Sequence, residues 1–343
     1  MRWPRLPRPF MRRPETGRRP RLVDACLLFN EVDLLEIRIG ELWDAVDLFV
    51  VVESNRSFAG VPKPYFLDAH WERFRRFASK MVYSKLAAGP SINRTTEDRF
   101  RAEAAQRNSL SKALAGCELH DDDIVILSDV DEIPRARLLS DLPERLCDRA
   151  YCVFVLDNCR GYLNNSSTAA LNRQPFAGPV ACRWGRFRRV GAQAVRRGAN
   201  RAGHVLERRD RHWSYVERGG WHFSSLGGMD AVTVKASNFS HVEDPYQVAR
   251  PPPQRVPIQV FNAAIGREEC VLSQKRYLEG AVEPRFLPMT FKEFRIDGDL
   301  PGYLIANKER FRRYFYFTDL VRPAKDTEIP RGDSPTTECS RGS

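Results

Sequence analysis

The residues best suited to chemistry are two acids, Asp129 and Asp131, which directly follow an apolar run of strand length. At the end of a buried strand, two carboxylates separated by one residue can reach the same divalent cation. Hard oxygen ligands of this kind suit Mg²⁺ or Mn²⁺, and such a cation neutralises a diphosphate. The alternative is a solvated turn, because acids are common at strand ends. The strand and the helix that precede the pair favour the cation site.

Two further candidates precede this pair in the chain. Arg107 and Asn108 lie on an expected helix, where an arginine fork and an amide can hold a phosphate or a ribose. The alternative for Arg107 is an ion pair on the helix surface. Glu53 closes an earlier apolar run, where a carboxylate accepts hydrogen bonds from ribose hydroxyls or a base in nucleotide-binding sheets. Its alternative is a helix cap or a turn residue.

The remaining candidates include residues in a glycine-rich stretch of the C-terminal half. His222 is a candidate metal ligand or phosphate donor, with a packed histidine as the alternative, and His241 has the same two interpretations. Asp230 is a candidate general base. It also falls in the first turn of an expected helix, where the helix dipole favours an acid in any case. Lys63 and Lys235 are candidate phosphate contacts, with solvated lysines as the alternative.

The elements that must position these side chains alternate between strands and helices. Strands are expected over 22–30, 46–52, 80–84 and 123–128, and helices over 31–45, 68–79 and 96–117. This alternation predicts a doubly wound, mostly parallel sheet of the α/β class. Ligands in such sheets bind beyond the carboxyl ends of the strands, so Glu53, Asp129 and Asp131 are expected at that edge.

Beyond residue 134 the pattern changes and predicts an added β-rich region. A strand is expected over 151–156, and short strands over 159–218. A helix is expected from about residue 227 to 239, and a closing amphipathic helix over 301–320.

The segment between residues 186 and 218 contains ten arginines. It lacks the zinc spacing, helix-turn-helix pattern or aromatic string of nucleic-acid readers. A solvated or acceptor-facing basic surface is therefore favoured, and no specific nucleic acid is expected as a partner.

Composition indicates a globular protein with a basic leader. The 343 residues are 42% hydrophobic, and the longest apolar runs fall far short of the ~20 residues of a membrane-spanning helix. The net charge is +11, but the eight arginines and Glu15 within residues 1–21 account for 8 − 1 = +7 of it. Eight dispersed cysteines without a C-x-x-C pair are expected to be reduced. With no signal peptide recognised, a cytoplasmic location is predicted, with peripheral contact to anionic membrane through the leader.

Three stretches, FNEVDLLEIR, LSDVDEIP and GWHFS, together resemble glycosyltransferase family 17, the β-1,4-mannosyl-glycoprotein 4-β-N-acetylglucosaminyltransferase family. The resemblance covers about residues 21–320. It implies an inverting enzyme with a GT-A-like Rossmann fold, a UDP-GlcNAc donor, a divalent metal and a glycan or glycoconjugate acceptor. Residues 21–134 would form the nucleotide-sugar-binding half and 135–320 the acceptor-side half of one domain. Disorder is expected in the leader, 1–20, and in the tail, 321–343.

The resemblance also implies roles for individual residues. Asp129 and Asp131 stand at the D-x-D positions, with Asp131 as the more direct metal ligand and Asp129 near the ribose and the metal. Arg107 and Asn108 match the segment that lines the donor site. In the same way, Glu53 matches the end of the second strand, and His222 matches the G-W-H position.

The sequence departs from the animal members of this family, which have a membrane anchor and a glutamate near the position of Asp230. Two alternative functions therefore stay open. One is a transferase that uses another nucleotide sugar for a bacterial surface glycan. The other is a non-catalytic basic module that binds nucleic acid or a membrane surface.

Overall fold

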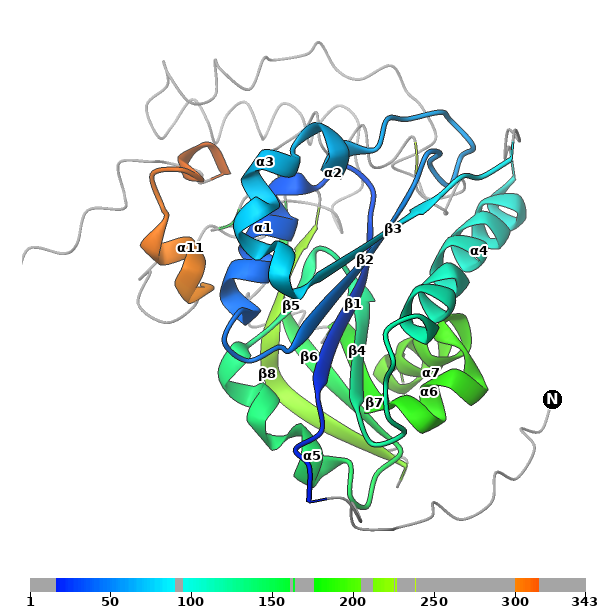
Figure 1. Cartoon of the computed structure of the whole chain (residues 1–343), viewed down its shortest axis with the longest axis vertical. Helices are drawn as coiled ribbons and strands as arrows, with labels where there is room; N and C mark the ends of the chain where they lie inside the picture. Colours follow the sequence, from blue (N-terminus) through cyan, green and yellow to red (C-terminus); the bar gives the residue numbers. More distant parts are fainter. Residues whose placement is uncertain are drawn as a thin grey trace, which may run out of the picture.

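The computed structural model describes residues 17–89, 95–160, 163, 176–204, 212–224, 226, 238 and 300–314 (Figure 1). The strands are β1 (Leu22–Leu28), β2 (Leu48–Ser54), β3 (Met81–Leu86), β4 (Ile124–Asp129), β5 (Glu132–Pro134), β6 (Tyr151–Arg160), β7 (Phe176–Arg183) and β8 (Trp213–Ser224). The helices are α1 (Val32–Leu42), α2 (Phe66–Ala69), α3 (Trp71–Phe74), α4 (Thr96–Ala115), α5 (Leu142–Arg145), α6 (Trp184–Val190), α7 (Ala192–His204) and α11 (Gly302–Ala306). Short 3-10 segments are η1 (Arg75–Lys80), η2 (Ala136–Asp141) and η4 (Arg312–Tyr314).

The strands form one sheet in the order β3-β2-β1-β4-β7-β6-β8-β5. Its first four strands pair in parallel, and their order, β3-β2-β1-β4, matches the first four positions of the Rossmann order 3-2-1-4-5-6. The predicted GT-A-like α/β class is confirmed by this topology. The added β-rich region continues the same sheet, with antiparallel pairs β4–β7, β6–β7 and β5–β8 and the parallel pair β6–β8.

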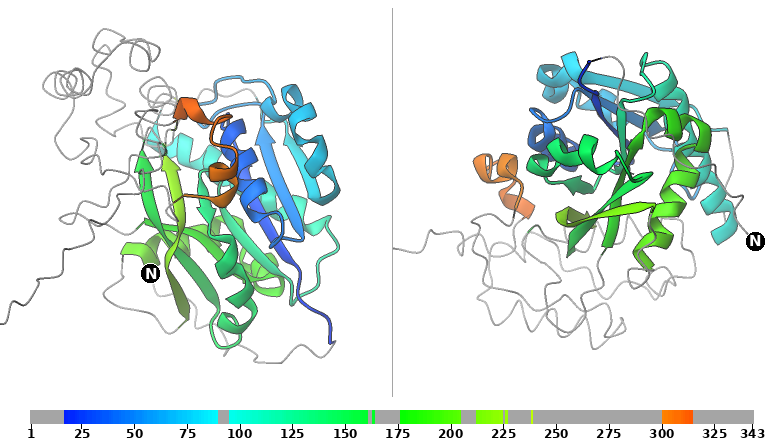
Figure 2. Two further views of the ribbon diagram at one scale, coloured as in Figure 1. Left: turned by 90° about the vertical axis from the view of Figure 1, so that its left-hand side faces the viewer. Right: turned by 90° about the horizontal axis from the view of Figure 1, so that it is seen from below.

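Helices cover both faces of the sheet, as the two views in Figure 2 show. On one face, Cys26 and Phe49 belong to the buried cluster that contains the inner side of α1. On the other, Val50 and Val125 share a cluster with residues of α4, α6 and α7. Because both faces are buried, the strands are apolar at successive positions rather than alternating, which is what made them recognisable in the sequence.

Two predictions about the C-terminal half were wrong. Much of the arginine-rich segment, expected as short strands, is helical, in α6 and α7. The buried residues Ala192, Val195 and Ala199 are three and four positions apart, which is the spacing of one helix face. The expected helix over 301–320 is also shorter, because only α11 and η4 form within the described residues 300–314.

Other features can be compared only in part. The helix expected over 68–79 is divided into α2, α3 and η1. In the part of the chain that the structure describes, no helix combines the length and apolar character needed to span a bilayer. Most of the leader, the helix expected near 227–239 apart from residue 238, and the tail lie outside the described residues.

Candidate metal and donor site

The tight turn between β4 and β5 carries the two acids that the sequence singled out. Antiparallel pairing of β5 with β8 sets Glu132 opposite His222, and the backbone N–H of Phe223 donates to the carbonyl oxygen of Asp131 at 2.8 Å. This register brings the His222 ring to the turn, where its Nε2 lies 3.6 Å from an Asp131 carboxylate oxygen. Strand pairing therefore joins two candidates that are 91 positions apart in the sequence.

A glycine makes the close approach of β5 and β8 feasible. Gly220 pairs with Pro134, and a Cβ at this position would lie only 2.1 Å from the carbonyl oxygen of Ile133. Any larger residue would push the strands apart. The glycine of the G-W-H motif thus helps to hold His222 beside the turn.

Asp131, Glu132 and His222 form a buried group of potential metal ligands, with one ligand atom from each within 4.8 Å of the others. The His222 ring stacks on Phe176 at a centroid distance of 4.0 Å. Its Nδ1 is buried and has no hydrogen-bond partner among the described residues. Two carboxylates and an imidazole with an unpartnered nitrogen are a donor set that fits a divalent cation. Glu132 was not among the ligands predicted from the sequence.

Asp129 lies outside this group of three and contacts two arginines instead. Its Oδ1 is 3.1 Å from Nη2 of Arg107, and its Oδ2 is 3.3 Å from Nη2 of Arg196. Burial favours a higher pKa for the Asp129 carboxyl, but the two guanidinium groups outweigh it and lower this pKa. Asp129 is therefore held as a carboxylate, and its role as a metal ligand stays a prediction.

Arg196 of α7 is another site residue that was not predicted from the sequence. Its Nη1 donates to Glu132 Oε2 at 2.8 Å and to the carbonyl oxygen of Gly178 at 2.9 Å, and its Nη2 contacts the other Glu132 oxygen. Both side chains are almost fully buried. Burial raises the pKa of Glu132, and the charge of Arg196 opposes that rise. The sequence offered only membership of an arginine-rich segment, which does not distinguish a buried arginine from an exposed one.

The predicted donor-binding pair, Arg107 and Asn108, does lie beside the site, but both residues have protein partners. Nη1 of Arg107 contacts Glu103 at 2.7 Å and Gln193 at 2.9 Å, in addition to the contact of Nη2 with Asp129. The exposed Asn108 accepts a hydrogen bond from the backbone N–H of Gln193 in the first turn of α7. The pair connects α4 to α7, and Arg107 supplies positive charge directly next to Asp129.

Glu53 and Lys63 require a correction, because they form a buried internal pair. The Glu53 carboxylate is fully buried and accepts hydrogen bonds from Lys63, from Tyr83 and from the backbone N–H groups of Phe66 and Leu67 at the start of α2. The ribose contact predicted for Glu53 is not supported, since its oxygens already have four donors. The alternative interpretation, a helix cap, is what the structure shows. Lys63 is likewise turned toward protein rather than toward a phosphate.

Two arginines at α6 pair with acids at the amino end of β4 rather than near the metal-ligand group. Arg188 pairs with Asp121, and Arg183, directly before α6, pairs with Asp122. Both acids precede β4, so these pairs lie at the amino end of that strand, opposite the turn that carries Asp131. The other candidates Asp230, Lys235 and His241 lie outside the described residues.

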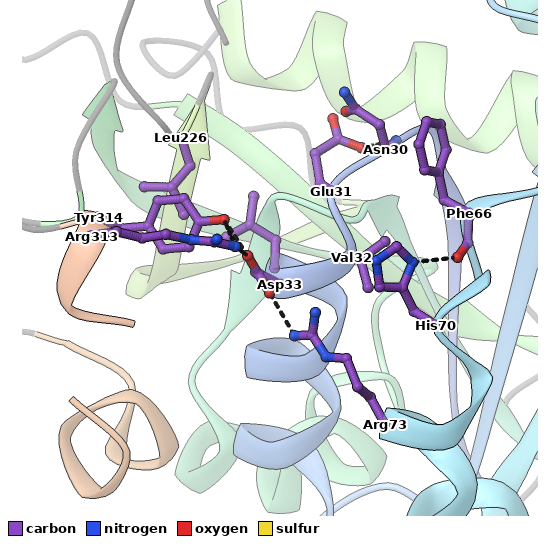
Figure 3. Close-up of a pocket in the computed structure, with 11 residues that line it drawn as sticks. Asn30, Glu31, Val32, Asp33, Phe66, His70, Arg73, Leu226, Arg313 and Tyr314 are labelled. Carbon is purple, nitrogen blue, oxygen red and sulfur yellow. Dashed lines mark hydrogen bonds and ion pairs between the residues drawn. The ribbon is translucent and has the colours of Figure 1, made fainter. Parts of the chain in front are cut away.

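A pocket of about 320 Å³ lies at the carboxyl end of β1, between α1 and the segment formed by residues 300–314 (Figure 3). We call that segment the C-terminal strap. None of the residues of the metal-ligand group lines the pocket. Asp33 lies at its centre, where it accepts a hydrogen bond from Arg73 at 2.5 Å and contacts Arg313 and Tyr314 of the strap.

The strap is attached to α1 by charge and by apolar packing. The buried Glu36 carboxylate accepts hydrogen bonds from Arg310 and from the Tyr303 hydroxyl. Leu304 and Phe311 join a buried cluster that also contains Leu34 of α1. The strap therefore covers a face of α1 that would otherwise be exposed and apolar.

Replacing Asp33 with asparagine should loosen the strap at neutral pH. Burial favours a higher pKa for Asp33, but its hydrogen bonds with Tyr314, Arg73 and Arg313 lower this pKa below its ordinary value of 3.8. The carboxylate therefore contributes stability above that pH, and the contribution disappears as the pH falls through the folded-state pKa. Urea unfolding should show a stability gap between the wild type and the variant at pH 7 that shrinks toward pH 3.

The matched control is Asp44→Asn, which changes an exposed acid just beyond the end of α1. Trypsin should cleave within the strap of the Asp33→Asn protein faster than within the strap of the control or the wild type at pH 7. Equal cleavage rates would show that Asp33 does not hold the strap.

Comparison with known proteins supports the family resemblance for the first half of the chain. Residues 11–165 match the model of Glycosyltransferase family 17, which confirms the resemblance inferred from sequence motifs over that segment. The segment includes the turn at 129–132, whereas His222 lies beyond it. The wider extent predicted for the resemblance, to residue 320, stays a prediction.

The β-1,4-mannosyl-glycoprotein 4-β-N-acetylglucosaminyltransferases of Rattus norvegicus and Homo sapiens are each 34% identical to the chain over 118 residues. This stretch makes up 33% of the chain and 22% of each relative, so the chain matches about a fifth of these relatives' length. Among solved structures, S. aureus TarS 1–349 aligns with 86% of this chain and 89% of its own, at 12% identity and a TM-score of 0.35. A score this low supports no conclusion about the site.

Proposed function

We propose that this protein is a glycosyltransferase that moves a sugar from a nucleotide-sugar donor to a saccharide hydroxyl. The observation that carries the proposal is the buried group of Asp131, Glu132 and His222 at the carboxyl edge of a Rossmann-type sheet. This edge is where such sheets bind nucleotides. The family match over residues 11–165 supports the same reaction class, since that segment supplies two of the three side chains.

The donor we propose is UDP-GlcNAc, by analogy with the names of the relatives, and the cation is Mn²⁺ or Mg²⁺. Asp131 and His222 would hold the cation, with Glu132 adjacent. When bound there, a divalent cation offsets the negative charge that develops on the departing diphosphate. Arg107 and Arg196 keep Asp129 ionised at the rim of the site, so this part of the protein is organised around fixed charges before a substrate arrives.

We further propose single displacement with inversion at the anomeric carbon. A carboxylate on the far side of the sugar would remove the acceptor hydroxyl proton, a contribution of typically ~10²–10⁴-fold to the rate. Asp230 stays the candidate for this base. The acceptor is proposed to be a glycan or glycoconjugate, and peripheral membrane contact through the basic leader stays a separate proposal.

A thermal-shift screen of nucleotide sugars, each with and without Mn²⁺, tests the donor and the cation together. A ligand at 100 times its Kd adds about 2.7 kcal/mol to the stability of a protein that binds it only when folded. We expect UDP-GlcNAc to raise the Tm in the presence of Mn²⁺ and to have little effect without it. GDP-mannose is the matched control, because it carries a sugar diphosphate on a different nucleoside.

The outcomes of this screen separate the candidate functions. A larger shift with another nucleotide sugar would favour the alternative transferase. The absence of a Tm shift with any sugar nucleotide, with or without metal, would contradict the enzymatic proposal. The non-catalytic basic binding module would then be the remaining alternative.

A further inference from the structure

An arginine in the middle of α1 has no role in the proposed reaction, yet it is fully buried. Arg38 is 0% exposed and lies in the FNEVDLLEIR stretch. The helix around it is apolar, with Leu35, Ile39 and Leu42 packed in the core. A guanidinium in such surroundings is costly unless a counter-charge and hydrogen-bond acceptors surround it. The contacts of the Arg38 guanidinium therefore indicate its structural role.

All five N–H donors of the Arg38 guanidinium have an acceptor. Nε and Nη2 donate to the two carboxylate oxygens of Asp24 at 2.7 and 2.6 Å, and Nη2 also donates to the Ser128 hydroxyl at 2.5 Å. Nη1 donates to two backbone carbonyl oxygens, those of Asp129 at 3.2 Å and Glu132 at 2.6 Å. The positive charge of Arg38 is thus balanced by Asp24. The Nη1 donors are directed at the carbonyl oxygens at the two ends of the β4–β5 turn.

The two carbonyls bracket the turn that carries Asp131. Asp129 is the last residue of β4 and Glu132 the first of β5, so one nitrogen of Arg38 fixes both ends of the reversal. The backbone N–H of Asp129 also donates to the Glu132 carboxylate at 3.2 Å, which closes the turn from within. The position of Asp131 relative to His222 therefore depends on a contact made from α1.

We propose that Arg38 is a positioning residue for the cation site, holding the β4–β5 turn so that Asp131 and Glu132 face His222. The inference rests on the proposed function, because it assigns Arg38 a part in building the site that binds the cation. Groups that orient metal ligands without touching the metal typically change metal affinity or activity by about 10–100-fold when they are replaced.

The variant Arg38→Lys tests this role. A lysine keeps the positive charge beside Asp24, but it has a single nitrogen and cannot reach Asp24 and both turn carbonyls as the planar fork does. We expect the full-length variant to fold, by circular dichroism, and its Kd for Mn²⁺ alone to rise about 10–100-fold by electron paramagnetic resonance titration. The KM for Mn²⁺ in sugar transfer should rise by a similar factor, with a smaller change in kcat.

A charge-balanced double variant, Arg38→Met with Asp24→Asn, serves if the lysine variant does not fold. It removes both buried charges together and should weaken Mn²⁺ binding in the same way. The matched control is Leu35→Ala on the same helix, which removes core packing but none of the hydrogen bonds that Arg38 donates to the turn carbonyls. Measured well below the unfolding temperature, its Kd for Mn²⁺ should equal that of the wild type.

Failure of this inference is distinct from failure of the proposed function. If the wild type binds Mn²⁺ and the Arg38 variants bind it equally well, Arg38 is only a structural residue and the inference is overturned. It is also overturned if Leu35→Ala weakens binding as much as Arg38→Lys does. If the wild type itself does not bind Mn²⁺, the cation site and the positioning role fail together.

Discussion

Asp131→Asn should abolish sugar transfer while leaving the fold intact. The carboxylate is buried at the turn, 3.6 Å from the His222 ring, and belongs to the group of three potential ligands. An asparagine has nearly the same shape but lacks the negative charge that a divalent cation requires. We expect activity to fall by at least ~10²-fold, as when a group that stabilises developing charge is lost. Binding of Mn²⁺ to the variant should be undetectable by titration.

The control for this variant is Asp122→Asn, which removes a half-exposed carboxylate beyond the opposite end of the same strand. Its transfer rate and Mn²⁺ binding should match those of the wild type. Wild-type activity in the Asp131→Asn protein would contradict the metal role. Loss of activity with unchanged Mn²⁺ binding would place the cation elsewhere.

Arg196→Met should cause a large loss of stability. The substitution leaves Glu132 as a buried carboxylate without its bidentate partner and removes one of the two arginines beside Asp129. Breaking one partner of a buried ion pair typically costs 3–5 kcal/mol, so we expect a loss of about that size. Urea unfolding followed by tryptophan fluorescence measures it.

Two further variants distinguish the effect of the unpaired Glu132 charge on stability from the effect of general damage to α7. Arg197→Met alters the exposed neighbour on the same helix and should change stability by no more than about 0.5 kcal/mol. Adding Glu132→Gln to Arg196→Met removes the stranded charge, so the double variant should recover much of the lost stability. If the double variant is no more stable than Arg196→Met, loss of packing rather than charge explains the effect.

The sheet could be predicted because its first half is built from local signals. The strand at 48–54 and the helix at 96–115 were recognisable from short apolar runs and helical spacing, with boundaries within two residues of those observed. The prediction of strands in the arginine-rich segment was wrong for α7 because the apolar residues of this helix are small and sparse. Among residues 192–199, the part of α7 whose side chains the structure describes, the buried apolar residues are Ala192, Val195 and Ala199, and the charged residues around them conceal the period.

The candidate site could be predicted only in part, because some of its residues are brought together by pairing between distant strands. Asp131 and His222 carried recognisable motifs, and β5–β8 pairing joins them. Arg196 carried no such signal, and Arg38, although it is the last residue of the FNEVDLLEIR stretch, was not recognised either. Nothing in the local sequence of these two arginines shows that a charged side chain is buried. Glu53 was misassigned for a related reason, because its four donors come from two other segments of the chain, residues 63–67 and the strand that contains Tyr83.

The attachment of the strap has a consequence for biosynthesis. The backbone N–H of Tyr303 donates to the Glu41 carboxylate, 262 positions earlier in the sequence, so the apolar side of α1 stays uncovered until the strap has been synthesised. At roughly 5–20 residues per second, that interval lasts about 13–52 s on the ribosome. Throughout it, Leu34 and Ile37 lack Leu304 and Phe311 as neighbours. The nascent protein therefore exposes apolar side chains of α1 until the strap is made, so we expect chains truncated before residue 300 to aggregate more readily than the full chain.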